Sequence, residues 1–300
     1  MTTPAQVSGF GAAPPPSSPP REHLRGTPLG TFGAELSDFS IAHDLNDDTF
    51  AAVEKLFYDS HLLVLRGQSL SPRQFHSWAS RFGRPEPHVI DQFHHREIAD
   101  ILWLSNVVKD GVPQGLADAG TYFHTDYSYL AKVARATTLY SIEVPRVGGN
   151  TLFADQTAAW EDLPGTMKAQ IEKLQVRHHY GNRDDLNERS RTVASVLSDE
   201  QKHRVNWVTH PLVLTHWYTG RKALYSVSGS SFGIEGMSDQ EGRDLLDQLK
   251  HHSTHPRYQV SVRYGMGDVV LWDNLALLHS ATLTDPSMPR TLWRITVKAP

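Results

Sequence analysis

The 300-residue sequence contains no cysteine. This absence excludes disulfide scaffolds, thiolate-zinc sites, iron–sulfur clusters and cysteine nucleophiles. The 17 histidines, by contrast, exceed average usage and invite a search for metal ligands. A chain without cysteine also suits a reducing compartment, and we expect a cytoplasmic location.

Long apolar runs and blocks of like charge are missing as well. No uninterrupted apolar stretch reaches the roughly 18 residues that a membrane-spanning helix needs, so we predict no membrane contact. The formal net charge is −4, and without a basic block the chain is a poor partner for nucleic acid. We expect a small-molecule partner, and a homo-oligomer stays open.

The N-terminal segment lacks the composition of a folded core. It begins "MTTPAQVSGFGAAPPPSSPP", which is rich in Pro, Ser, Ala and Gly and has neither the basic start nor the apolar core of a secretory signal. We predict a disordered arm over 1–25. No internal repeat or further boundary follows, so 26–300 is predicted to be a single domain.

Short β-rich runs dominate the rest of the chain. Apolar spacing and capping residues predict helices at 47–60, 71–83, 158–175 and 237–253. Strands are predicted at 61–68, 99–108, 121–130, 135–144, 149–156, 210–217, 222–228, 258–264, 267–274 and 290–298. A polar stretch at 181–205 is expected to be a loop or insert. This order indicates a mainly β fold with inserted helices, a double-stranded β-helix or jelly roll.

The stretch "YFHTDYSYL" contains a candidate pair of metal ligands. On a strand, side chains alternate between faces, so His124 and Asp126 would share one face and lean toward one ion. Taken alone, the pattern His-X-Asp is more often an ordinary strand than a metal site. A third ligand is needed.

His279 offers that third ligand, after the predicted strand 267–274 and a short apolar run. Two imidazoles and one carboxylate that leave one face of the ion open form the facial triad of non-heme Fe(II) oxygenases. His279 is far from His124 and Asp126 in the sequence, so only the fold can bring the three together.

Two arginines follow near the end of the chain. Arg290 and Arg294 would lie on one face of the predicted strand 290–298. A buried, unpaired guanidinium is very costly, so each needs an anion. That anion is either an internal acid such as Asp273 or the carboxylate of a small molecule, which the planar guanidinium binds in bidentate fashion.

Several motifs occur together in one order: "HTD", "EVPRVGGNTLFAD", "GRKALY", "GDVVLWDN", His279 and the closing arginines. Over about 27–298 this ordered set resembles the family of taurine dioxygenase and 2,4-dichlorophenoxyacetate dioxygenase. The resemblance implies a jelly-roll enzyme that uses Fe(II), 2-oxoglutarate and O2. It implies hydroxylation, or oxidative cleavage or rearrangement, of a small acidic organic molecule, with release of succinate and CO2. His124, Asp126 and His279 then resemble the iron ligands.

The resemblance also implies roles for residues around the metal. Thr151 and Arg290 match positions that hold the distal carboxylate of 2-oxoglutarate. Arg294 matches an arginine near the proximal carboxylate and the substrate anion. His88 and Asn106 match substrate-contacting positions.

Two positions depart from the taurine enzyme. Asp91 and Gly120 stand where that enzyme carries an aromatic and a polar substrate contact, which argues against a taurine-like substrate. The segment Ser228-Gly229-Ser230 suggests a smaller or more polar wall of the substrate pocket.

The other histidines outside the candidate site fall into two groups. We expect the pairs 94–95, 178–179 and 251–252 to be solvated, and His210 and His216 to be structural.

Rival activities are desaturation or rearrangement of an amino-acid derivative, metal binding without turnover, and zinc-dependent hydrolysis. Oxygen-dependent formation of succinate separates an oxygenase from a binding protein.

Overall fold

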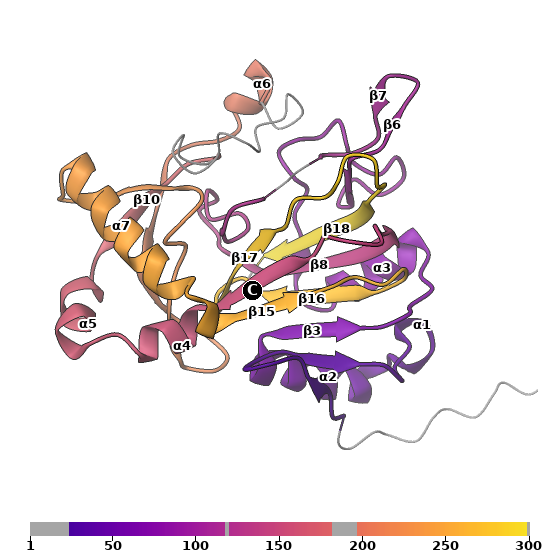
Figure 1. Cartoon of the computed structure of the whole chain (residues 1–300), viewed down its shortest axis with the longest axis horizontal. Helices are drawn as coiled ribbons and strands as arrows, with labels where there is room; N and C mark the ends of the chain where they lie inside the picture. Colours follow the sequence, from indigo (N-terminus) through magenta and orange to yellow (C-terminus); the bar gives the residue numbers. More distant parts are fainter. Residues whose placement is uncertain (1–23, 118–119, 182–196, 299–300) are drawn as a thin grey trace, which may run out of the picture.

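The computed structural model describes residues 24–117, 120–181 and 197–298 (Figure 1). Most of the predicted arm at 1–25 and much of the polar stretch at 181–205 lie outside these residues, so both stay predictions. Within the described ranges, none of the helices has both the length and the apolar character needed to cross a bilayer.

A large, mostly antiparallel sheet forms one layer of the fold (Figure 1). Its strand order is β1-β2-β3-β16-β8-β18-β4, and β5 also pairs with β18. The strands are β1 (Thr27–Pro28), β2 (Ala34–Leu36), β3 (Leu62–Leu65), β4 (Arg84–Pro85), β5 (Leu102–Ser105), β8 (Ala134–Glu143), β16 (Val269–Asp273) and β18 (Thr291–Lys298). Because β16 lies between β3 and β8, the last third of the chain completes a sheet begun by the first third.

A smaller sheet packs over one face of the large one, in the order β15-β9-β17. Further small sheets have the orders β11-β10-β14, β12-β13 and β6-β7. Their strands are β6 (Val108–Lys109), β7 (Val112–Pro113), β9 (Thr151–Asp155), β10 (Gln175–His178), β11 (Val208–Pro211), β12 (Val213–Thr215), β13 (Lys222–Leu224), β14 (Ser231–Ile234), β15 (Gln259–Val262) and β17 (Leu277–Ala281). The predicted jelly roll, mainly β with inserted helices, is confirmed.

Strand β3 explains how the layers are held together. Leu62 and Val64 join the core between the two sheets, where Phe153 of β9 also packs. Leu63 and Leu65 point the other way, into a core shared with the N-terminal helices. A strand covered on both faces reads as a continuous apolar run, which is why "LLVL" shows no alternation.

The helices cover the outer face of the large sheet and the β10 side of the molecule (Figure 1). They are α1 (Ile41–Asp44), α2 (Asp47–Ser60), α3 (Pro72–Ser80), α4 (Gln156–Glu161), α5 (Gly165–Ile171), α6 (Asp199–Lys202), α7 (Asp239–Ser253) and a 3-10 turn, Pro256–Tyr258. The predicted helices are confirmed, with a break before Gly165 in the third. Capping boxes at Asn46, Ser71 and Ser238 begin α2, α3 and α7.

The predicted strand at 121–130 is wrong. Only His124 forms an isolated antiparallel bridge, with His279, and the chain then enters a turn. Tyr127 adopts a positive φ of 56° in that turn. Aromatic and β-branched residues favoured a strand, but tertiary hydrogen bonds at Thr125 hold the turn instead.

Further expectations differ from the structure. His178 is fully buried in β10, so its predicted exposure is wrong, and its neighbour His179 is partly buried. In the pair on helix α7, His251 is exposed and His252 is partly buried. The apolar run after Asp273, for which no strand was predicted, forms β17. By contrast His210 and His216 are buried, in line with a structural role.

Candidate active site

Strand β17 and the turn after His124 bring the predicted triad together. The backbone N–H of His124 donates to the His279 carbonyl, and that of His279 donates to the His124 carbonyl, each at 2.9 Å. The two imidazoles lie side by side with ring centroids 4.1 Å apart. The Thr125 hydroxyl, which contacts the carbonyls of Asn274 and Leu277 at 3.0 and 3.1 Å, holds the turn that directs Asp126 back toward them.

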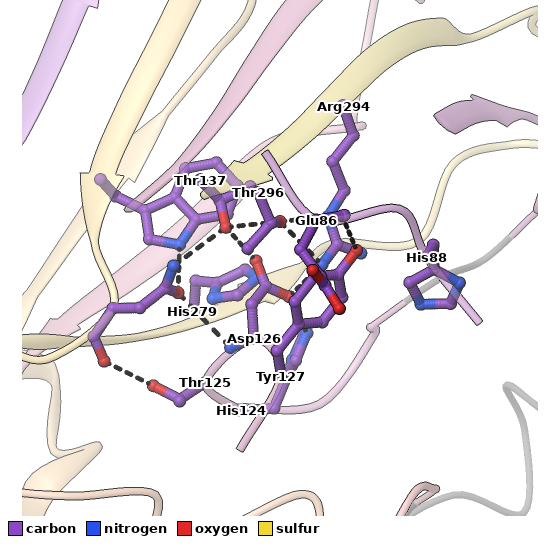
Figure 2. A network of polar contacts seen from close by, with 12 residues as sticks. Glu86, His88, His124, Thr125, Asp126, Tyr127, Thr137, His279, Arg294 and Thr296 are labelled. Carbon is purple, nitrogen blue, oxygen red and sulfur yellow. Dashed lines mark hydrogen bonds and ion pairs between the residues drawn. The ribbon is translucent and has the colours of Figure 1, made fainter. Parts of the chain in front are cut away.

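The three side chains present ligand atoms to one point (Figure 2). Oδ1 of Asp126 lies 3.7 Å from Nε2 of His124 and 3.7 Å from Nε2 of His279. Two atoms that each lie about 2.1 Å from one ion are at most about 4.2 Å apart, so both separations suit a shared metal. Among the described residues, this is the cluster of histidines and carboxylates whose spacing fits a metal ion.

The protonation of the imidazoles also fits metal binding. Nδ1 of His124 lies 2.8 Å from the carbonyl of Tyr122, so this nitrogen carries the hydrogen and Nε2 keeps its lone pair. Burial lowers the pKa of His124 and brings that of His279 well below its ordinary value. Both rings are therefore neutral, which is the form that binds metals.

Asp126 is ionised despite its burial. Burial opposes ionisation, but Arg294 and the hydrogen bond from Thr137 outweigh it and hold the pKa of the Asp126 carboxyl well below its usual range. Nη2 of Arg294 lies 2.7 Å from Oδ1 of Asp126, and the Thr137 hydroxyl donates to Oδ2 at 2.6 Å (Figure 2). The internal acid beside Arg294 is thus Asp126, and Asp273 pairs with histidines instead.

Tyr264 connects Arg290, which lines a cavity, with Thr151. The cavity is lined by Leu104, Ser105, Asn106, Leu116, Ala117, Thr121, Ala281, Thr282, Thr284 and Arg290. Nε of Arg290 donates to the Gly149 carbonyl at 3.2 Å, and its Cζ lies 5.6 Å from the ring centroid of Tyr264. The Tyr264 hydroxyl is 2.8 Å from Oγ1 of Thr151, so Tyr264 links the two predicted cosubstrate residues.

Asn106 lies on the Arg290 side of the site. Its Oδ1 accepts from the backbone N–H of Arg290 at 2.9 Å, and its Nδ2 donates to the Met288 carbonyl at 3.0 Å. The amide thus braces the segment that leads into β18, and it also lines the cavity.

His88 lies on the Arg294 side. Its ring is 5.7 Å from that of Tyr127, whose own ring centroid lies 5.3 Å from Cζ of Arg294. Nδ1 of His88 accepts from the backbone N–H of Ile90 at 3.1 Å, so Nε2 carries the hydrogen. Burial, and then Arg294, lower the pKa of His88 to about 3, so the ring is a neutral donor.

Of the two positions that depart from the taurine enzyme, Asp91 lies away from the site and Gly120 lies against His124. Asp91 is exposed and pairs with Arg204 at 2.7 Å and with Gln201 at 2.9 Å, so it belongs to the surface rather than to the pocket wall. Gly120 has a φ of 72°, and a Cβ there would collide with the imidazole of His124. A residue larger than glycine would therefore displace a candidate ligand.

Sequence reasoning did not single out Thr137, Asn274, Thr296 or Tyr264. Thr137 and Thr296 were hidden because β-branched residues are ordinary on strands. Asn274 was present in the quoted "GDVVLWDN" motif, but nothing in the motif indicated which atoms its amide would contact. The contacts of Thr137 with Asp126 and Thr296 become visible only in the folded chain (Figure 2). The same holds for the contact of Asn274 with Thr137 and that of Tyr264 with Thr151.

Comparison with known proteins places this geometry in a family. The model of the "Taurine catabolism dioxygenase TauD, TfdA family" matches residues 24–296. The 2,4-dichlorophenoxyacetate dioxygenase of Cupriavidus pinatubonensis, described as alpha-ketoglutarate-dependent, is 34% identical over 278 residues, which cover 88% of this chain and 94% of that protein. The (S)-phenoxypropionate/alpha-ketoglutarate-dioxygenase of Sphingobium herbicidovorans is 31% identical, over 88% of this chain and 90% of that protein.

A solved structure is similar over nearly the whole chain. The crystal structure of AAD-2 in complex with Mn(II) and N-oxalylglycine superposes with a TM-score of 0.78 at 30% identity, covering 92% of this chain and 98% of the other. The fold, the cluster of His124, Asp126 and His279, and these likenesses agree. The chain belongs to the TauD/TfdA family and is an Fe(II)- and 2-oxoglutarate-dependent dioxygenase.

Proposed function

We propose that this dioxygenase hydroxylates a small organic acid at a metal held by His124, Asp126 and His279. The observation that carries the proposal is the single oxygen Oδ1 of Asp126, which faces two imidazole Nε2 atoms at 3.7 Å each. Three neutral or anionic ligands on one side leave the other side of an Fe(II) ion for exchangeable ligands. When bound, Fe(II), 2-oxoglutarate and O2 supply the oxidation that converts a C–H bond to C–OH, with succinate and CO2 as coproducts.

Arg290 and Thr151 are proposed to bind the distal carboxylate of 2-oxoglutarate. A guanidinium matches a carboxylate with two parallel N–H donors, and the Thr151 hydroxyl adds a neutral donor. Tyr264 supports this assignment because its ring faces Arg290 and its hydroxyl contacts Thr151. Together they would fix the cosubstrate at the end that does not react.

Arg294 and His88 are proposed to read the acidic group of the prime substrate. Four residues along a strand span roughly 13 Å, so Arg294 cannot share one carboxylate with Arg290. A metal on Oδ1 of Asp126 would neutralise part of the charge that Arg294 now faces, which leaves the guanidinium able to bind a second anion. The neutral His88, with its hydrogen on Nε2, adds a donor on the same side. The substrates that name two relatives, 2,4-dichlorophenoxyacetate and phenoxypropionate, are small organic acids and support this assignment.

The 2-oxoglutarate assignment is tested with Arg290→Ala. A charge-assisted contact contributes about 1.5–3 kcal/mol, so the apparent KM for 2-oxoglutarate should rise roughly 10- to 150-fold. Arg263→Ala is the control, because Arg263 is exposed. Within the described residues, its side chain donates one hydrogen bond, to the Arg146 carbonyl. A change confined to the prime-substrate KM contradicts the assignment.

The substrate class is tested by following 2-oxoglutarate consumption over sulfonates, aryloxy acids, phosphonates and amino acids, each beside a neutral ester or amide analogue. We expect coupled, oxygen-dependent succinate formation with an acid and not with its neutral analogue. Turnover that prefers the neutral analogues contradicts the proposed anion recognition. A cytoplasmic location, a single domain and a homo-oligomer remain predictions.

A further inference from the structure

Asn274 lies next to the candidate metal ligand Asp126, in the turn between β16 and β17. It is almost fully buried, and it is neither a candidate ligand nor part of the cosubstrate pocket. Its side chain contacts the Trp272 indole, the Thr137 hydroxyl and the backbone of Asp126. These contacts place one amide between the end of strand β16 and the carboxylate of Asp126.

The chemistry of its neighbours fixes which way the amide points. Nε1 of Trp272 lies 3.1 Å from Oδ1 of Asn274, and the backbone N–H of Asp126 approaches the same oxygen at 3.4 Å. An indole N–H and a backbone N–H can only donate, so the atom that they face must be the amide oxygen. The amide nitrogen, Nδ2, is therefore the atom 2.9 Å from Oγ1 of Thr137, and it donates there.

That orientation fixes the hydroxyl hydrogen of Thr137. Oγ1 of Thr137 lies 2.6 Å from Oδ2 of Asp126, 2.9 Å from Nδ2 of Asn274 and 2.9 Å from Oγ1 of Thr296. A hydroxyl has one hydrogen, and the ionised carboxylate can only accept. The hydrogen therefore goes to Oδ2 of Asp126.

The second threonine completes the chain of donors. Its Oγ1 accepts from Nε and Nη2 of Arg294, each at 3.3 Å. Thr137 donates its one hydrogen to Asp126. The contact between the two hydroxyl oxygens therefore requires the Thr296 hydroxyl to donate to Thr137. Every hydrogen bond in this chain thus has one consistent direction, from Arg294 and Asn274 toward Oδ2 of Asp126.

We propose that Asn274 is a positioning residue that, through Thr137, restricts Asp126 to binding the metal by Oδ1 alone. Oδ2 is occupied by a strong hydrogen bond from Thr137, while Oδ1 faces both imidazoles and the guanidinium of Arg294. A carboxylate that bound through both oxygens would take one more position on the ion and leave fewer for exchangeable ligands. The inference rests on the proposed ligand role of Asp126.

The test compares two neighbouring threonines on β8. Thr137→Val removes the donor to Asp126 and keeps the shape of the side chain. Thr138→Val is the matched control, because Thr138 is buried on the opposite face, where its hydroxyl accepts from Nε1 of Trp78 at 3.3 Å. Each metal-free variant is titrated with Co(II) by calorimetry, and the visible absorption of the Co(II) form is recorded, since it reports the coordination number.

We expect Thr137→Val to weaken Co(II) binding about 10- to 100-fold, as is typical when a partner of a metal ligand is lost, and to change the Co(II) spectrum. Thr138→Val should keep the wild-type affinity and spectrum. Thr137→Ser retains the hydroxyl and should restore both. Asn274→Asp should show the spectral change of Thr137→Val, because the new carboxylate can take the Thr137 hydrogen away from Asp126, whereas the amide of Asn274 donates to the Thr137 oxygen.

Matching results for Thr137→Val and Thr138→Val overturn the inference, and so does weaker binding with an unchanged spectrum. Asp126→Ala separates this failure from failure of the metal site. If Asp126→Ala retains wild-type Co(II) affinity, the ligand assignment itself is wrong. If it loses Co(II) while Thr137→Val behaves like its control, only the role of Asn274 is wrong. Thermal unfolding of each variant identifies any that does not fold.

Discussion

Two buried aspartates in this protein are each flanked by two histidines, yet only one of these sites suits a metal. Asp126 faces His124 and His279 at 3.7 Å, whereas Asp273 lies 2.8 Å from Nε2 of His216 and 3.4 Å from Nδ1 of His61. Both carboxylates are almost completely buried. Residue types alone therefore do not separate the two sites.

The direction of the imidazole hydrogens makes the difference. Nδ1 of His216 accepts from the backbone N–H groups of Tyr218 and Thr219 at 3.1 and 3.2 Å, so its Nε2 carries the hydrogen and donates to Asp273. Nδ1 of His124 instead donates to a carbonyl, which turns a lone pair toward Asp126. The lone pair that His124 turns toward Asp126 leaves room for a metal cation, whereas the Asp273 site is closed by its own hydrogen bonds.

Loss of the metal is the largest effect that this comparison predicts. Asp126→Ala should abolish Fe(II)-dependent turnover of 2-oxoglutarate, because one of three protein ligands is removed. Asp273→Asn should keep both metal binding and coupled succinate formation, since its carboxamide oxygen can still accept from His216. Normal coupled activity in Asp126→Ala, or loss of Fe(II) binding in Asp273→Asn, would reverse the roles assigned to the two sites.

Stability should respond in the opposite order. Asp273→Ala leaves buried donors of His216 and His61 without their acceptor, at about 1–3 kcal/mol each, so the free energy of unfolding should fall by about 2–6 kcal/mol. Asp100→Ala is the control, because Asp100 pairs with His76 at the same 2.8 Å but is 28% exposed. Its loss should cost less than about 1 kcal/mol. Similar losses in chemical denaturation would show that the Asp273 site adds nothing beyond a surface pair.

The Asp273 site should also impose a pH dependence on stability. Burial opposes ionisation, but hydrogen bonds from His216 and His61 outweigh it and lower the pKa of Asp273 to about 2. A pKa that is lower in the folded than in the unfolded state gives stability that is present above about pH 4 and is lost as the pH falls toward about 2. The shift corresponds to about 2 kcal/mol. Asp273→Asn should remove this part of the acid sensitivity, and a wild-type slope in that variant contradicts the assignment.

Much of the fold could be predicted, because local patterns and tertiary packing agree there. Helices α3 and α7 begin at capping boxes that are visible in the sequence, Ser71 with Gln74 and Ser238 with Glu241. The segment 121–130 was misread because its aromatic residues favour strands, while the turn depends on the Thr125 hydroxyl and carbonyls of the distant residues Asn274 and Leu277. No local pattern contains that information.

The candidate site shows the same limit. The residue types and order of His124, Asp126 and His279 could be read from the sequence, and the fold brings them together as expected. The partner of Arg294 could not, since choosing between Asp126 and Asp273 requires the register of β18 against β8. The closure of the Asp273 site depends on backbone N–H groups at 218 and 219, which every sequence possesses.

The smallest predicted effect concerns a cation that Asp126 has and Asp273 lacks. Oδ1 of Asp126 contacts Arg294, whereas the described partners of Asp273 are imidazoles and backbone N–H groups. If Arg294 reads the substrate anion once a metal binds Oδ1, then Arg294→Lys keeps the charge and loses the paired donors. Loss of one charge-assisted hydrogen bond, about 1.5 kcal/mol, should lower kcat/KM for an acidic substrate roughly 10-fold. A neutral ester of the same substrate should be much less affected, because it offers no anion for the second donor.

The two rates are compared in the wild type and the variant at saturating 2-oxoglutarate, with Co(II) affinity measured alongside to show that the metal site is intact. Equal losses for acid and ester would mean that Arg294 serves Asp126 or the cosubstrate and does not select the substrate.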